Sequence, residues 1–127
     1  MQIRFTVWQF VRVMVWLEES QGKSVALKKA YEAWADTWTP IDQELAKLAA
    51  DDHDAYSAMM MDQEVVLEGV PKEQGREVLK ALEAVTMSMK AEMDAGKGDE
   101  EYLESLRLER RELRGKSTKL KKALERD

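Results

Sequence analysis

The segment FTVWQFVRVMVWL, residues 5–17, constrains the fold more than any other part of the chain. Ten of its thirteen residues are Phe, Val, Trp, Met or Leu. On a helix these apolar side chains cover a sector of roughly 220°, which is more than one neighbouring helix can enclose. We therefore expect a helix, capped by Thr6, at the centre of a bundle or between subunits. Trp16 falls on its polar side, and we expect it at an interface.

A strand is the alternative for the same residues, because β-branched and aromatic side chains are enriched in strands. An isolated strand would leave its backbone hydrogen bonds unmade. We see no other segment with a strand pattern, so this alternative requires a hairpin or a strand from another molecule. We favour the helix.

The apolar segment does not have the features of a membrane span or a signal peptide. Spanning a bilayer takes about 20 mostly apolar residues, and this run is shorter and contains Gln9 and Arg12. Glu18-Glu19-Ser20-Gln21 follows where a cleavage site would need small residues. We expect an uncleaved, cytoplasmic protein that does not bind membranes.

Glycines and prolines divide the first half of the chain into three expected helices. Gly22 ends the first, and Ser24 is a candidate N-cap for the second. Thr39-Pro40 has the pattern of an N-cap followed by proline at the first helical position, so a third helix should begin there. We expect this third helix to continue as far as Glu68, with a possible break at residues 51–54.

The second half predicts a helical hairpin. Helices over residues 71–95 and from Asp99 to the C-terminus are joined by the glycine loop of residues 95–99. In the last helix, positions at heptad spacing form a seam whose predicted interface residues are Leu103, Leu106, Arg110, Leu113, Leu120 and Leu124. An exposed amphipathic helix without a partner is marginal, so this seam should pack within the chain or on another subunit.

The expected fold is all-α: about five helices in a bundle with a long, coiled-coil-like C-terminal antiparallel hairpin. Residues 1–70 would form an aromatic-rich helical core and residues 71–127 the hairpin, within a single folding domain. A length of 127 residues suits one domain.

Charge is distributed unevenly along a chain whose net charge is −5. Residues 36–68 contain nine acidic residues and one lysine, and residues 105–127 contain nine basic and four acidic residues. Solvated helix faces explain this most simply. Alternatively, the acidic segment of one subunit meets the basic helix of another. A third possibility is that the basic helix contacts nucleic-acid phosphates through Arg111, Arg114, Lys119 and Lys122. A fourth is that the acidic segment mimics a nucleic acid and inhibits a basic-groove protein.

Residues suited to catalysis or metal binding are few. The chain has no cysteine and a single histidine, His53, between aspartates that would point away from it on a helix. The spacing in EEYLE, residues 100–104, resembles the magnesium-binding helix of all-α nucleotide pyrophosphohydrolases. That family has a second acidic helix downstream, where this chain is basic. We therefore expect no enzymatic activity, catalytic residue, metal, cofactor or small-molecule substrate.

The sequence as a whole predicts a non-enzymatic helical interaction protein. Its partner would be a second copy of itself, a larger assembly in which it is a subunit or adaptor, or both. The methionines at residues 59–61 are expected mainly in the core, although methionine-rich surfaces also bind partners adaptably. Nucleic-acid binding by the last helix is the alternative from another class.

Overall fold

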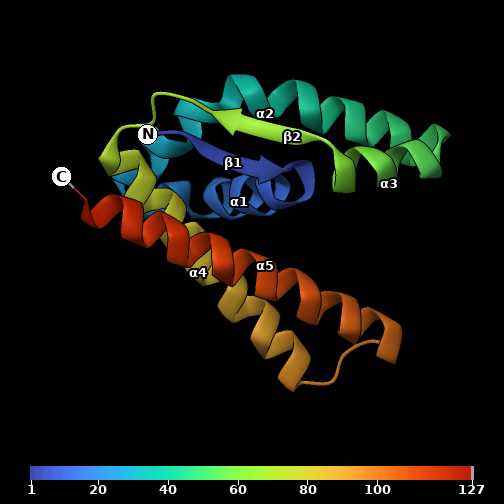
Figure 1. Ribbon diagram of the computed structural model, residues 1–127. Coiled ribbons are helices and arrows are strands. Elements are labelled where there is room, and N and C mark those ends of the chain that lie inside the picture. The colour runs from blue at the N-terminus through green and yellow to red at the C-terminus, as the bar shows by residue number, and fades with distance from the viewer. Residues whose placement is uncertain (127) are drawn as a thin grey trace.

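The computed structural model describes residues 1–126, and within this range the chain is mostly helical (Figure 1). The elements in order are β1 (Ile3–Thr6), α1 (Val7–Ser20), the short 3-10 helix η1 (Gln21–Lys23), α2 (Val25–Asp51), α3 (His53–Asp62), β2 (Glu64–Leu67), α4 (Lys72–Asp94) and α5 (Glu100–Glu125). The expected all-α class is confirmed, with a small antiparallel sheet of β1 and β2 added to it.

The sheet corrects two expectations about the chain. β1 pairs with β2 so that Ile3 lies opposite Leu67 and Phe5 opposite Val65. All four of these side chains are buried, and the alternate positions face outward, as the two-residue period of a strand requires. The idea that no segment could pair with an N-terminal strand was therefore wrong. The helix expected to reach Glu68 was wrong as well, because α3 ends at Asp62.

Thr6 divides the apolar N-terminal segment into a strand and a helix. Its hydroxyl oxygen accepts a hydrogen bond from the Gln9 backbone N–H at 3.1 Å, and the Gln9 side chain accepts one from the Thr6 N–H at 3.0 Å. This reciprocal capping box satisfies two donors at the start of α1. The predicted cap is confirmed, and residues 7–20 form the expected helix.

α2 continues through Pro40, so the predicted boundary at Thr39-Pro40 was wrong. Proline removes one backbone N–H, which leaves the Asp36 carbonyl without its usual helical donor. Just before the proline, the Thr39 hydroxyl donates to the Ala35 carbonyl at 2.9 Å. Trp34 and Trp38 before the proline and Leu45 after it are all buried, so one continuous apolar side holds both halves of α2 against the core.

The predicted break near residues 51–54 lies at Asp52. Its backbone N–H donates to the Leu48 carbonyl at 2.8 Å and closes α2. Its carboxylate accepts from the Ala55 N–H at 3.1 Å and begins α3. One aspartate thus ends one helix and caps the next.

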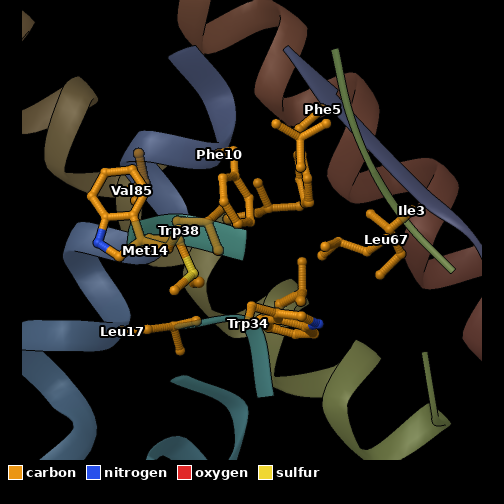
Figure 2. Packing of buried hydrophobic residues seen from close by; sticks show 14 of the residues in the cluster. Ile3, Phe5, Phe10, Met14, Leu17, Trp34, Trp38, Leu67 and Val85 are labelled. Atoms are coloured by element: carbon orange, nitrogen blue, oxygen red, sulfur yellow. The ribbon is translucent and has the colours of Figure 1, made fainter. Parts of the chain in front are cut away.

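Aromatic side chains from β1, α1 and α2 meet at the centre of the molecule (Figure 2). Phe10 is fully buried, with its ring centroid 6.1 Å from that of Phe5 and 6.0 Å from that of Trp38, the latter pair edge to face. Trp34 and Met14 are buried in the same cluster, as Figure 2 shows. The two N-terminal helices supply most of this aromatic core, as expected.

α4 and α5 form the predicted antiparallel hairpin, whose loop end projects away from the remaining elements (Figure 1). Asp99 caps α5 by accepting from the Tyr102 N–H at 2.8 Å. Midway along the hairpin, the Arg110 side chain donates to the Thr86 carbonyl at 3.1 Å. At the other end, Gly75 lets Leu124 approach α4, since a Cβ added there would lie 3.1 Å from the leucine side chain.

Candidate functional site

The leucines of the predicted interface lie mainly in the core. Leu106, Leu113 and Leu120 are buried in the same cluster as the side chains of α1 and α4, and Leu103 and Leu124 are half-buried. Arg110, the remaining residue of the seam, is half-buried and bound to Thr86. The heptad pattern identified the apolar side of α5 correctly. The chain itself covers Leu106, Leu113 and Leu120, which is one of the two arrangements expected for this seam, and a contact of the seam with another subunit stays a prediction.

Trp16, the other predicted interface residue, lines an open groove of about 470 Å³. The groove is formed by the outward side of α1, one residue of α3 and a stretch of α4. Its lining residues are Trp8, Val11, Arg12, Val15, Trp16, Glu19, Met60, Val85, Ser88, Met89 and Glu92. It is the strongest candidate for a binding site among the described residues, because it combines concave shape with apolar and charged groups.

The helical period of α1 explains why this groove is apolar. Phe10 and Leu17 point into the core and are fully buried. Arg12, Val15 and Glu19 follow one another at three- and four-residue spacing on the opposite side. Val15 is 41% exposed although it is a large apolar residue. The apolar sector of α1 is thus wider than its neighbours in the chain can cover.

Charged groups lie along the edges of the groove. The Arg12 guanidinium carbon lies 5.2 Å from the centroid of the Trp8 ring, within the range of a cation–π contact. Burial raises the pKa of Glu109 on α5, nearby Arg12 lowers it, and Glu112 raises it further. A hydrogen bond to the Glu92 carboxylate raises the pKa of Tyr102. The groove therefore has both a cationic group and acidic groups at its margin.

The four predicted nucleic-acid residues, Arg111, Arg114, Lys119 and Lys122, are all exposed on α5. The structure brings the two arginines together in a hollow of about 460 Å³ lined by Arg107, Leu108, Arg110, Arg111, Arg114, Gly115 and Thr118. The two lysines lie further along the helix toward its C-terminus. Arg107 pairs with Glu104 and Arg110 donates to the Thr86 carbonyl, so Arg111 and Arg114 are the arginines of the hollow best placed to meet an anionic partner.

The acidic segment does not form one continuous face. Asp42 and Glu44 are two residues apart on α2 and therefore point in nearly opposite directions. Asp51, Asp52 and Asp54 are exposed at the turn between α2 and α3.

The residues considered for chemistry lie apart. His53 is exposed, and its ring lies 6.4 Å from that of Tyr56 in a stacked arrangement. Glu104 forms an ion pair with Arg107 at 2.6 Å. Among residues 1–126 no group of three or more His, Asp or Glu side chains is arranged to hold a metal ion.

Sequence reasoning missed the contribution of α3 and α4 to the groove. Of the methionines considered as a possible binding surface, Met59 is buried, Met60 lines the groove and Met61 is exposed. Their run in the sequence gave no indication of which one would face α1. Val85 and Met89 of α4 also line the groove, and no pattern in the sequence marked either of them as part of a binding site.

No helix within residues 1–126 is both long and apolar enough to cross a membrane. Comparisons of the chain with protein-family models, curated proteins and solved structures find no match. Inference about function therefore depends on the groove and the charged surfaces alone.

Proposed function

We propose that this protein is a non-enzymatic, cytoplasmic interaction protein that works as a homo-oligomer or as a subunit or adaptor of a larger assembly. The observation that carries the proposal is the groove around Trp16. Other elements also expose single apolar side chains, such as Val25 and Met87, whereas α1 keeps Val15 exposed and Trp16 half-exposed beside a hollow. Tryptophan at the centre of a concave apolar surface is typical of binding hot spots.

An amphipathic protein helix fits this groove best. The floor is largely apolar, with Val11, Val15 and Met60 from two helices, and the charged groups lie at the margin. Helices that bind in grooves place apolar side chains at three- and four-residue spacing on such a floor and polar ones at its edge. The mixture of Arg12 with acidic residues at the edge favours a partner helix that carries both signs of charge.

Site-specific crosslinking tests the proposal. A photoreactive amino acid replaces Val15 in the full-length protein, in its native host, and crosslinked peptides are identified by mass spectrometry. A matched control places the same group at Val25, which is 72% exposed at the start of α2 and outside the groove. We expect position 15 to label one helical peptide, from a second copy or from another protein, and Trp16→Asp to abolish that labelling. Equal, unselective labelling from both positions would contradict the proposal.

Nucleic-acid binding by α5 is the second candidate function, and the four arginines lining one hollow support it. Phosphate contacts make affinity fall steeply with salt concentration. Charge reversal at Arg111 and Arg114 should abolish retention of DNA or RNA, whereas reversal at the exposed Lys28 and Lys29 on α2 should not. Retention that is independent of salt, or equally sensitive to both pairs of changes, would exclude this function.

A further inference from the structure

We propose that the occupant of the groove is α1 of a second copy of this chain, lying antiparallel to the first across a two-fold axis that passes between Val15 and Trp16. This inference rests on the proposed function and names the partner for the same groove. In a two-fold interface the same surface of each copy is used, so the surface must be complementary to itself.

The charges on α1 have this self-complementary register. Arg12 and Glu19 both line the groove, and the point midway between them in the sequence falls between Val15 and Trp16. When two copies of α1 lie antiparallel about that point, Arg12 of each copy faces Glu19 of the other. Two opposite-charge pairs form, related by the axis, and no like charges of the two α1 helices face each other.

The apolar residues fall in the same register. Val15 of one copy meets Trp16 of the other at the axis, and both side chains line the groove. Association would cover the part of the apolar sector that α2, α3 and α4 leave open. Burial of such surface is the main favourable contribution to association of this kind.

The contacts that Arg12 and Glu19 make within the chain leave both side chains able to pair with a second copy. Arg12 lies over the Trp8 ring and near Glu109 on α5, but it has no hydrogen-bonded ion pair within residues 1–126. Glu19 is exposed, and its side chain has no ion pair or hydrogen bond among the same residues. Glu92, also at the margin, already accepts a hydrogen bond from Tyr102.

The size of the groove predicts a weak dimer. Eleven residues line it in each copy, and a standard stable interface uses about 20–30 residues a side. We therefore expect a dissociation constant on the order of 10 μM, which a transient interface of this size can give. Salt should weaken the dimer moderately, because the charge pairs lie at the edge and are accessible to solvent.

Charge exchange between copies provides the test, with sedimentation velocity of the full chain over a concentration series as the readout. In a dimer of the Arg12→Glu variant, positions 12 and 19 that face each other across the interface are both acidic. In a dimer of the Glu19→Arg variant, they are both basic. Each variant alone should therefore dimerise about tenfold more weakly than wild type. An equimolar mixture of the two variants restores both opposite-charge pairs and should form a 1:1 heterodimer. The double variant Arg12→Glu/Glu19→Arg should dimerise like wild type.

The outcomes separate this inference from the proposed function. Glu19→Arg changes an exposed residue without internal partners, so it remains informative even if Arg12→Glu disturbs the Trp8 and Glu109 contacts. Recovery in the mixture supports the antiparallel pairing. Equal dimerisation of all variants, or no recovery in the mixture, overturns it. A wild type that stays monomeric at 200 μM, while position 15 crosslinks to another protein, overturns the dimer and leaves the proposed function standing. A monomer without selective crosslinks overturns both.

Discussion

The apolar sector of α1 and the leucine seam of α5 were both expected to pack against a neighbour, and the chain buries the core of the seam but leaves part of the sector open at the groove. On α5 the leucines at positions 106, 113 and 120 repeat every seven residues and occupy one narrow side, which the chain buries. On α1 apolar residues occur at almost every position. The inward side of α1 is buried, while Val15 and Trp16 remain at the groove.

This difference shows that the width of a helix's apolar sector, more than its hydrophobicity, decides how much apolar surface the chain leaves uncovered for a partner. A seam of about two residues per heptad can be covered by one packed helix. A sector of roughly 220° needs neighbours on several sides. In α1 the strand β1, α2, α3 and α4 all contribute, and one side still stays open.

Replacing Leu113 by Asp gives the most severe test of the enclosed side of α5. Leu113 is 0% exposed, so the change removes a core side chain and buries an unpaired carboxylate, at an expected cost of about 5 kcal/mol. Circular dichroism during urea unfolding measures the loss. Leu108→Asp is the matched control, because Leu108 lies on the same helix and is 52% exposed. Equal stability of the two variants would show that the leucine side is not enclosed.

Phe10→Ala tests the enclosed side of α1 in the same way. The ring is fully buried between Phe5 and Trp38, and its truncation should cost about 3–4 kcal/mol through lost burial and the cavity left behind. Val15→Ala, on the open side of the same helix, should change the free energy of unfolding of the monomer by less than about 0.5 kcal/mol. A large loss of unfolding free energy in Val15→Ala at low protein concentration would mean that the inward and outward sides of α1 are equally enclosed.

Local sequence signals predicted the starts of α1 and α2, because the interactions that make them lie within a few residues, whereas the same kind of signal at Thr39-Pro40 failed. Thr6, Ser24 and Asp99 each accept a backbone N–H three residues further on, and Thr6 and Ser24 were predicted as caps. The antiparallel hairpin followed from the glycine loop. Positive φ at Gly96 and Gly98 fits that prediction.

Features that depend on distant parts of the chain could not be predicted. β1 and β2 are short, and each becomes a strand only because the other, about sixty residues away in sequence, supplies hydrogen bonds. Pro40 is accepted inside α2 because buried side chains on both sides hold the helix in place. For the site, the helical projection of α1 indicated Trp16. The apolar pattern of α5 identified its buried side but not whether the covering surface came from the same chain.

On the outward side of α5, replacing a glycine by alanine should stabilise the protein, because the added methyl group has room there. Gly115 lies inside the helix, and a Cβ added there would meet no atom within 4 Å. Glycine within a helix is less favourable than alanine by about 0.5–1 kcal/mol, so Gly115→Ala should raise stability by about that amount. Gly75→Ala on α4 is the control, since its Cβ would press on Leu124 and Met1 at 3.1 Å and should bring less gain or a loss. A destabilised Gly115→Ala would indicate that this side of α5 is covered.

Replacing Glu109 tests the contact between α5 and Arg12 of α1. Its effect on stability should be the smallest of those predicted. Burial raises the pKa of this carboxyl in the folded protein, so ionised Glu109 disfavours folding. The protonated Glu109 carboxyl stabilises the folded protein fully below the ordinary carboxyl pKa. This stabilisation is lost as pH rises through the raised pKa of the folded state. Glu109→Gln should therefore melt slightly higher than wild type at pH 7, and the difference should disappear near pH 4.

The control for this change is Glu101→Gln in the exposed first turn of α5, which should give no comparable gain at pH 7. Arg12 opposes the effect of burial, because its charge lowers the pKa of the same carboxyl. Thermal melts of both variants at the two pH values decide between the two influences. A Glu109→Gln variant less stable than wild type at pH 7 would mean that attraction to Arg12 dominates. Arg12 would then be held by α5, with less freedom to meet Glu19 of a second copy.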